Sequence, residues 1–189
     1  MSAGTRDLIL DTALELFHMN GYTATGVTDI TRAAGVPKGS FYHFFDSKET
    51  LAVETVNRYA ERTQVGILRD PSRSPLERIR THIDLMISLA TAGGSPRGCL
   101  LGTFSTEMPS QSDSITLVVN ARLDAWTDQL ALTIAEASEA GEISTHSDPR
   151  RMAGFIVAGL EGAFARAKVS RSRKPLDDFR ESLFEYVLN

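Results

Sequence analysis

The chain has 189 residues, of which 42% are hydrophobic, and it carries a formal net charge of −4 with a sequence pI of about 5.6. It contains no apolar run as long as a membrane span, so we expect no membrane partner. The opening residues MSAGTRD lack the apolar core of a secretory signal, and the single cysteine, Cys99, cannot form an internal disulfide. These features predict a cytoplasmic globular protein without a disulfide framework.

An amphipathic helix is predicted from about Arg6 to Asn20. Its inner face would consist of apolar side chains at helical spacing, namely Ile9, Ala13, Leu16 and Phe17. The pair Asn20-Gly21 ends this helix.

The next segment has the pattern of two short helices joined by a tight turn. An apolar face at helical spacing predicts the first of them, with Val27, Ile30, Ala33 and Ala34. Gly35 ends this helix because glycine adopts a positive φ at little steric cost, and Pro37 starts the next because proline is tolerated at a first helical position. The second helix would bury Phe41 and either Phe44 or Phe45.

The opposite side of this second helix gathers small, polar, basic and aromatic groups near its N-terminus: Lys38, Gly39, Ser40, Tyr42 and His43. A recognition helix presents such groups to base edges and phosphates in the major groove of DNA. Lys48 starts the following helix, where backbone N–H groups and the helix dipole favour a phosphate. The segment therefore predicts a helix-turn-helix that binds double-stranded DNA.

From Thr5 to Arg62 the chain resembles the N-terminal domain of the TetR (tetracycline-repressor-like) family, through TALELFHMNGY, VTDITRAAGVPKGSFYHFF and SKETL. The resemblance implies an all-α transcriptional regulator, most often a repressor. It would have a three-helix helix-turn-helix DNA-binding domain at residues 4–64. A C-terminal helical bundle at residues 74–189 would bind ligand and form the dimer. The implied partners are a near-palindromic DNA operator, a second copy of the chain and an unknown small-molecule effector, with no cofactor.

The same resemblance assigns roles to the candidate residues. The polar side of the second short helix would face DNA, with Tyr42 and Lys48 as phosphate contacts. Members of the family commonly carry Thr or Ser just before the first of the two short helices, where this chain has Gly26. Thr25 is expected to substitute as the helix cap and phosphate donor.

The charge of this region argues against tight nonspecific DNA binding. Residues 1–48 contain four cations against five acids: Arg6, Arg32, Lys38 and Lys48 against Asp7, Asp11, Glu15, Asp29 and Asp46. Counterion release scales with the number of phosphates neutralised. Affinity would therefore depend on a few well-placed donors, and Arg6 is the only candidate for a minor-groove arm.

The rest of the chain reads as helices with brief breaks. Ser47 caps a helix that continues toward Leu68, and the turn-rich DPSRSP that follows is a linker. Periodic apolar residues and capping signals predict further helices at about 76–90, 114–140, 150–167 and 176–188.

The last two predicted helices are candidates for a dimer interface. The helix at 150–167 combines small groups, which allow close helix approach, with large ones: Gly154, Ala158, Gly159, Gly162 and Ala163 beside Phe155, Leu160 and Phe164. The final helix offers Phe179, Leu183, Phe184, Val187 and Leu188. The alternative is that both are ordinary core faces of a monomer.

An effector pocket is implied by the resemblance. Its candidate wall consists of apolar and aromatic residues on helices of the bundle: Met86, Leu89, Phe104, Trp126 and Phe155. Each could equally be plain core. The four histidines and one cysteine show no zinc-like ligand spacing, so no metal is expected.

Cys99 is the remaining candidate. The residues Gly98-Cys99-Leu100, the Ser-Thr-Glu that ends at Glu107 and AKVSRSRKPL resemble a TetR subgroup that includes electrophile-sensing repressors of the N-ethylmaleimide type, which use a cysteine at this position. A thiolate is the nucleophile, and Arg97 or Lys168, if close, would favour it. The alternative is an inert, buried small apolar residue.

Two other classes of function stay open at this point. An enzyme could use Cys99 with His82 or His146 as base, but no phosphate loop, dinucleotide motif or nucleophile elbow supports it. A helical ligand-binding or adaptor protein could keep the TetR-like fold without binding DNA. Loss of DNA binding on substitution of Tyr42 and Lys48 would separate the regulator from the adaptor.

Overall fold

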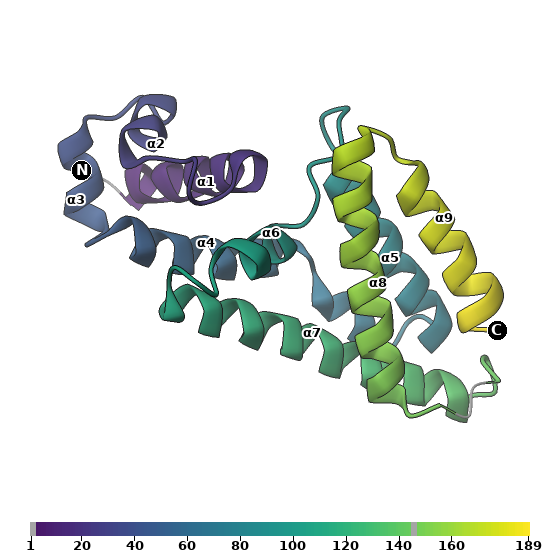
Figure 1. Ribbon diagram of the computed structural model, residues 1–189. Coiled ribbons are helices and arrows are strands. Elements are labelled where there is room, and N and C mark those ends of the chain that lie inside the picture. Colours follow the sequence, from purple (N-terminus) through teal and green to yellow (C-terminus); the bar gives the residue numbers. More distant parts are fainter. Residues whose placement is uncertain (1–2, 145–146) are drawn as a thin grey trace. The chain divides into compact units, whose positions relative to one another are not determined.

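The computed structural model describes residues 3–144 and 147–189 (Figure 1). The described residues form helices, turns and loops without a strand, so the predicted all-α class is confirmed. The chain divides into two compact units, Met1–Arg62 with Leu100–Arg122, and Thr63–Cys99 with Leu123–Asn189. Residues 100–122, expected in a C-terminal domain at 74–189, thus pack with the N-terminal unit.

The first unit consists of five helices and the start of a sixth: α1 (Ala3–Asn20), α2 (Val27–Ala33), α3 (Lys38–Phe44), α4 (Lys48–Arg62), α6 (Leu100–Glu107) and α7 (Asp113–Glu139) as far as residue 122. Its core is built mainly from aromatic and aliphatic side chains that are fully buried, including Ile9, Leu14, Phe17, Ile30, Phe41 and Leu51. α6 lies in a segment for which the sequence predicts no helix.

The turn between α2 and α3 forms as the sequence predicts. Gly35 has a positive φ of 66°, and the N–H of Val36 donates to the carbonyl of Thr31 at 3.0 Å. Pro37 is the N-cap of α3, so the helix begins at Lys38, one residue after the predicted start. Phe41 and Phe45 are the fully buried aromatic residues of this helix and its C-cap. Local residue chemistry alone therefore positions the second helix of the motif.

The second unit consists of the rest of α7 with η1 (Val65–Arg69), α5 (Pro75–Thr91), α8 (Pro149–Ser170), α9 (Lys174–Ser182) and η2 (Leu183–Val187). The prediction that the fourth helix continues toward Leu68 is wrong. α4 ends at Arg62, and Gln64 adopts a left-handed conformation with φ 48°, which breaks the helix before the 3₁₀ turn η1.

Side-chain caps set the starts of two long helices in this unit. The hydroxyl of Ser74 accepts from the N–H of Glu77, whose carboxylate accepts from the N–H of Ser74, and Pro75 follows as the first residue of α5. Asp148 accepts from the N–H of Arg151 at 2.8 Å at the start of α8. No helix within residues 3–144 and 147–189 is long and apolar enough to cross a membrane.

Candidate DNA-binding surface and effector site

The exposed face of α3 carries four of the predicted DNA contacts. Lys38, Gly39, Tyr42 and His43 are exposed, and Tyr42 retains 57% of its accessible surface. Gly39, Tyr42 and His43 follow Lys38 by one, four and five residues, so the four residues lie on one side of the helix. Ser40 departs from the prediction, because it is buried on the opposite side with only 5% exposure.

Thr25 has a different role from the predicted one. Gly26, not Thr25, is the N-cap of α2, and its N–H donates to the carboxylate of Asp29 at 3.1 Å. Thr25 is 1% exposed, and its hydroxyl donates to the carbonyl of Gly21 at 2.7 Å. The hydroxyl therefore fastens the turn after α1 and is not free to reach a phosphate.

Lys48 is held by the same turn. Its Nζ donates to the carbonyls of Tyr22 at 3.1 Å and Thr25 at 3.2 Å, and it lies 3.9 Å from the centre of the Tyr22 ring. Burial lowers the pKa of this amine, while the negative charge of Glu107 opposes the shift. An ammonium group has three N–H donors, so one remains for the phosphate contact, which stays a prediction.

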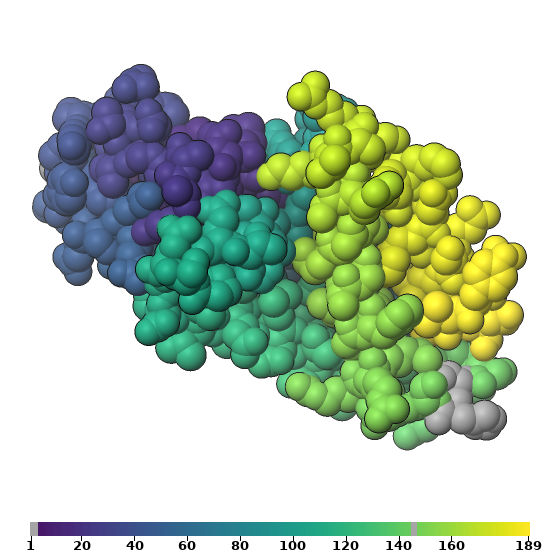
Figure 2. All heavy atoms as spheres, viewed as in Figure 1, coloured from purple at the N-terminus to yellow at the C-terminus, as the bar shows by residue number. Residues whose placement is uncertain are grey.

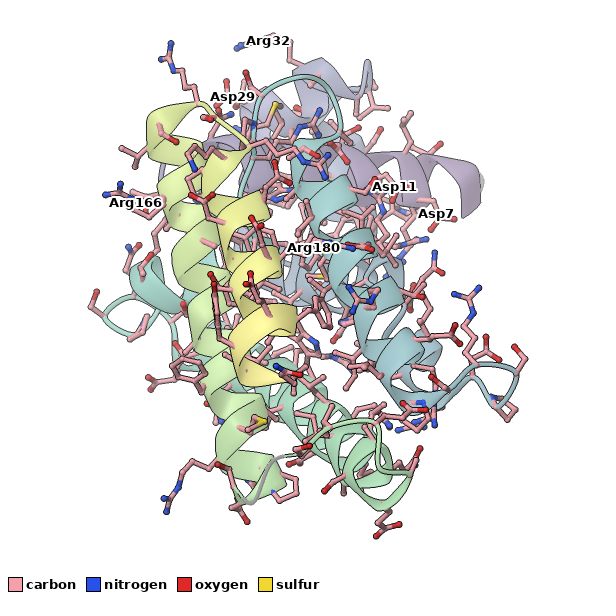
Figure 3. The ribbon with its side chains drawn as sticks, turned by 90° about the vertical axis from the view of Figure 1, so that its right-hand side faces the viewer. Asp7, Asp11, Asp29, Arg32, Arg166 and Arg180 are labelled. Carbon is pink, nitrogen blue, oxygen red and sulfur yellow. The ribbon has the colours of Figure 1, made fainter. Side chains whose placement is uncertain are left out.

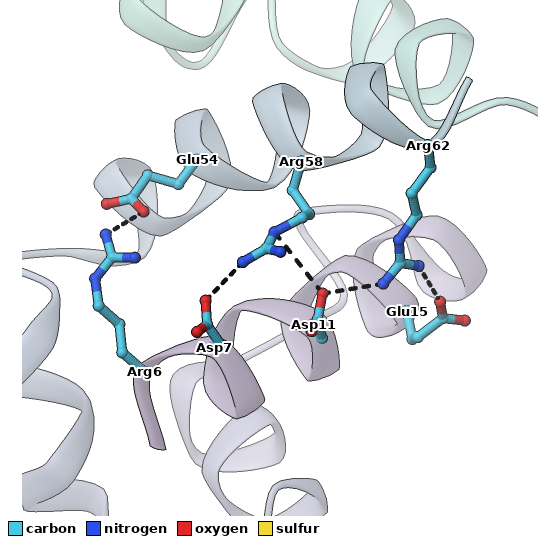
Figure 4. Close-up of polar contacts among 7 residues, drawn as sticks. All are labelled: Arg6, Asp7, Asp11, Glu15, Glu54, Arg58 and Arg62. Carbon is cyan, nitrogen blue, oxygen red and sulfur yellow. Dashed lines mark hydrogen bonds and ion pairs between the residues drawn. The ribbon is translucent and has the colours of Figure 1, made fainter. Parts of the chain in front are cut away.

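Ion pairs join α1 to α4 along the first unit (Figure 4). Arg58 pairs with Asp7 at 2.6 Å, and Arg62 pairs with Asp11 at 3.0 Å and with Glu15 at 2.9 Å. These pairs neutralise three of the five acids that made the region look unsuited to DNA.

Arg6 belongs to the same set of ion pairs. It pairs with Glu54 of α4, and its guanidinium lies 5.0 Å from the centre of the Phe45 ring. It is therefore engaged within the fold, which argues against the expected role as a minor-groove arm.

Glu107 at the end of α6 binds the turn after α1. Its Oε2 accepts from the backbone N–H groups of Tyr22 at 3.0 Å and Thr23 at 3.1 Å. Gly21 adopts φ 83°, and a Cβ there would lie 2.0 Å from Glu107 Oε1. Glycine is thus required by both backbone conformation and space. The α6 carboxylate fixes the loop that also receives Lys48.

The predicted effector wall is only partly brought together. Met86 and Trp126 are buried in the second unit, and Leu89 is half-buried. Phe104 belongs to the first unit, where its ring packs 5.8 Å from that of Phe17, so the prediction that it lines the pocket is not supported. Phe155 is 64% exposed and cannot be an interior wall of its own unit. Helical periodicity identifies the apolar residues but not which face each helix buries.

Buried polar groups near Trp126 are the feature that periodicity does not reveal. His82 on α5 is fully buried, and its ring lies edge-on to Trp126 of α7, with centres 5.8 Å apart. Neither ring nitrogen of His82, nor the indole nitrogen of Trp126, has a hydrogen-bond partner among the described residues. Burial lowers the pKa of His82 to about 4, so its imidazole is neutral at pH 7.

Cys99 is buried and paired with an acid. It is 3% exposed and hydrogen-bonds to the carboxyl group of Glu161 on α8. Burial raises the pKa of Glu161 to about 7, and the bond from Cys99 partly offsets this. The side chain of Lys168 passes Gly98, where an added Cβ would be 3.6 Å from Lys168 Cδ. The structure thus brings Lys168 beside the residue that precedes Cys99, and it adds Glu161, which sequence reasoning missed.

One side of α8 carries a stripe of exposed apolar and small residues. Phe155, Ala158, Gly162, Ala165 and Val169 are all exposed and recur every three or four residues. In the view of Figure 2, no other described element of the second unit lies over α8. The final predicted helix is the other candidate for the dimer interface, and it buries its apolar side instead.

The last helical segment turns its apolar side inward. Leu183 and Leu188 are each 2% exposed, and Phe184 is half-buried beneath the Arg80 guanidinium. Arg180 joins α9 to α5 through Asp84, with a 3.0 Å bond, whereas Arg166 projects away from α8 (Figure 3). Of the two candidate helices, only α8 presents an unpaired apolar face within the part of the chain that the structure describes.

The described residues contain no group of three or more His, Cys, Asp or Glu side chains arranged to hold a metal ion. His146, considered as a catalytic base, lies outside the described residues. The fold and the exposed face of α3 define a helix-turn-helix DNA-binding protein.

Comparison with known proteins gives the same class of protein. Residues 9–55 match the family model described as bacterial regulatory proteins, tetR family, and residues 75–183 match the tetracyclin repressor-like C-terminal domain. The chain is 34% identical to the HTH-type transcriptional repressor DhaR of Mycobacterium sp. (strain GP1), over 97% of this chain and 92% of the relative. It is 29% identical to the HTH-type transcriptional repressor NemR of Escherichia coli (strain K12), over 92% and 89%.

Solved structures agree. A crystal structure of regulatory protein TetR from Rhodobacter sphaeroides has a TM-score of 0.87 and 32% identity, covering 93% of this chain and 95% of that one. The reduced form of E. coli NemR has a TM-score of 0.85 and 27% identity, covering 95% of each chain. The chain belongs to the TetR family, and it is a DNA-binding transcriptional regulator rather than an enzyme.

Proposed function

We propose that this protein is a repressor that binds a near-palindromic DNA operator as a homodimer and releases it when a small molecule binds the second unit. The observation that carries the proposal is the exposed face of α3, where Lys38, Tyr42 and His43 stand on a helix fixed by buried Phe41 and Phe45. A dimer suits such a motif because two recognition helices then read two half-sites about one DNA turn apart.

The apolar stripe on α8 supports the dimer. The small residues Ala158, Gly162 and Ala165 allow two α8 helices to approach closely, and Phe155 and Val169 supply apolar area at either end of the stripe. A contiguous exposed apolar stripe on a soluble protein is typical of a protein interface. In a closed dimer the same face meets itself about a two-fold axis.

Helix α7 supplies a continuous path from the effector region to the DNA-binding unit. Trp126 lies one turn after Arg122, whose guanidinium donates to Asn57 Oδ1 of α4 at 2.7 Å. Ser112 and Ser114, around the start of the same helix, donate to the carboxylate of Glu49 near the start of α4. A movement of α7 on effector binding would therefore be transmitted to α4, which follows the recognition helix.

Coupling of this kind has a thermodynamic test. An effector that releases DNA must bind more weakly when operator is present, because the coupling free energy between two ligands is reciprocal. Equal effector affinity with and without operator would contradict release by this route.

One contact favours an electrophile as a second class of effector. Cys99 hydrogen-bonds to Glu161, whose carboxyl has a pKa of about 7 and can accept the thiol proton as the sulfur attacks. The sulfur would form a bond to an electron-poor alkene carbon, and the proton would pass through Glu161 to the neighbouring carbon. Burial of Cys99 at 3% exposure opposes rapid attack and supports the structural alternative.

The first experiment is selection of genomic fragments by the purified full-length protein at moderate salt. Recovery of a short near-palindrome would support a dimeric operator binder. The matched control is the Lys38→Met/Tyr42→Phe double variant, which removes two exposed polar groups and leaves the buried packing intact. If the parent protein is a folded dimer yet recovers nothing above the double variant, the adaptor alternative replaces the repressor.

A further inference from the structure

His82 and Trp126 are the buried polar pair in the second unit that the fold leaves unused. His82 is fully buried and Trp126 is 4% exposed, and their rings meet edge-on with centres 5.8 Å apart. They lie on α5, which has 17 residues and begins with a capping box, and on α7, which has 27 residues and an acidic first turn. The pair is therefore held on rigid elements rather than on loops.

Three hydrogen-bonding atoms of this pair have no partner within residues 3–144 and 147–189: His82 Nδ1, His82 Nε2 and Trp126 Nε1. An unpaired polar group inside a protein costs about 1–3 kcal/mol, and nearly all such groups in native proteins are satisfied. A valine, leucine or phenylalanine would fill the same space without that cost. Two adjacent side chains with unpaired polar atoms therefore indicate a site that binds a ligand.

The set of atoms limits what can bind. A neutral imidazole has one N–H donor and one acceptor nitrogen, and an indole has one N–H donor. The partner must accept hydrogen bonds and also donate one. A hydroxyl group does both, because it has two lone pairs and one hydrogen.

A carboxylate suits the site less well. It has no hydrogen for the acceptor nitrogen of His82, and burial holds the pKa of that imidazole at about 4, so the site offers no positive charge from histidine. Arg78 lies one turn before His82 on α5, and its Nε is also unpartnered among the described residues. However, its guanidinium already pairs with Glu136 at 2.6 Å and donates to the Leu68 carbonyl at 3.0 Å. An anion would have to compete with Glu136 for that charge.

We propose that His82 and Trp126 are the polar contacts of the effector site, and that the effector is an uncharged organic molecule with a hydroxyl group. This inference rests on the proposed function only in naming the bound molecule as the effector. The site itself is independent of whether the protein binds DNA. Met86, buried one turn after His82 on α5, would supply an adjacent apolar contact.

The chain provides its own reporter, because Trp126 is the only tryptophan. We would titrate the full-length protein with straight-chain and benzylic alcohols of increasing size. For each skeleton the corresponding carboxylate and hydrocarbon would be compared. Indole fluorescence reports binding at the site, and operator release reports the regulatory response. Failure of operator binding by free protein would refute the proposed function while the fluorescence titration still tests the site.

The expected result is that at least one alcohol changes Trp126 fluorescence and releases operator, with its carboxylate needing roughly tenfold or more higher concentration. His82→Phe should raise the half-effective alcohol concentration by roughly tenfold or more, because it removes the hydrogen bonds and keeps an aromatic ring. The same variant should leave the denaturation midpoint unchanged or raise it, since His82 has no hydrogen-bond partner in the described protein to give up. Ile83→Val, next to His82 and buried, should respond as the parent does.

Several results would overturn the proposal. A carboxylate or hydrocarbon that acts as well as its alcohol would refute the chemical class. Retention of the alcohol response by His82→Phe would refute the site, and so would a series in which no alcohol changes the fluorescence. A lowered denaturation midpoint in His82→Phe without loss of the response would show that permanently bound water satisfies the pair.

Discussion

Lys48 Nζ donates a hydrogen bond to the backbone carbonyl of Tyr22 at 3.1 Å and lies 3.9 Å from the centre of the Tyr22 ring. The lysine at the start of α4 is therefore part of the packing of the helix-turn-helix as well as a candidate phosphate contact. Lys38, by contrast, is exposed at the start of α3 and forms no ion pair with the residues that the structure describes. The two lysines should behave differently when replaced.

Lys48→Met should lower the free energy of unfolding by about 1–3 kcal/mol, because it removes a charged donor to two carbonyls. Lys38→Met should leave stability unchanged. It should reduce the salt dependence of operator binding by about 0.9 in the log–log slope for each phosphate that the lysine no longer neutralises. Urea unfolding and operator titrations at several salt concentrations measure both effects. If the salt dependence of operator binding changes in Lys48→Met but not in Lys38→Met, then Lys48 and not Lys38 is the phosphate contact.

The apolar stripe on α8 should control the oligomeric state. Replacing Ala158 with Arg places a charge at the middle of the stripe, where burial against a second copy would leave it unpaired. We expect sedimentation at the mass of a monomer and loss of operator binding. Tyr186→Arg is the matched control, since Tyr186 is 73% exposed outside the stripe. A dimer that persists in Ala158→Arg would place the interface elsewhere.

The burial of Glu161 should make stability depend on pH. Burial raises the pKa of Glu161 to about 7, so the folded state keeps a proton that the unfolded chain has released. This contribution is complete below the ordinary carboxyl pKa of about 4.5 and disappears as the pH rises through about 7. Glu161→Gln should therefore stabilise the protein more at pH 8 than at pH 5, by on the order of 2–3 kcal/mol.

His82 acts in the opposite direction. Its pKa is lowered to about 4, so its contribution is complete above about 6.5 and is lost as the pH falls through about 4. In His82→Phe the unfolding free energy should consequently fall more steeply between pH 5 and pH 8 than in the parent. Denaturant unfolding at a series of pH values gives the slope of the unfolding free energy against pH for each protein. Parallel curves for the parent, Glu161→Gln and His82→Phe would contradict the assigned pKa shifts.

Burial of Cys99 sets the rate at which it can be alkylated. At 3% exposure, reaction with N-ethylmaleimide should be at least about tenfold slower in the folded protein than in urea. If an electrophile is the effector, Glu161→Gln should slow the folded-state reaction further because the variant has no proton acceptor. Mass spectrometry follows the adduct. An unchanged rate in Glu161→Gln, with operator release unaffected by alkylation, would leave Cys99 as a structural residue.

The contact between Arg122 and Asn57 should carry the effector response. Asn57→Ala removes the acceptor of the 2.7 Å bond without touching the recognition helix. Operator affinity should stay within about twofold, whereas the ratio of effector affinities with and without operator should move toward unity. Isothermal titration of effector into free and operator-bound protein measures that ratio. A ratio equal to that of the parent would show that coupling follows another route.

Local sequence chemistry predicted much of the helix-turn-helix. Gly35 permits the positive φ that ends α2, Pro37 precedes α3, and the spacing of Phe41 and Phe45 turns Lys38, Tyr42 and His43 outward. The later helices were found from caps and periodicity for the same reason. Each of these features depends on residues within one or two helical turns, so the sequence alone determines them.

The tertiary structure decided what those helices meet. Ser40 is buried, Thr25 bonds to Gly21, and Phe104 packs with Phe17 rather than in an effector site. The approach of His82 to Trp126 and of Cys99 to Glu161 joins side chains far apart in the chain. Periodicity gives the face of a helix but not its neighbour, because the neighbour is chosen by packing of the whole unit. The sequence by itself thus determined the DNA-binding motif, and only packing in three dimensions decided where buried polar groups were left for an effector.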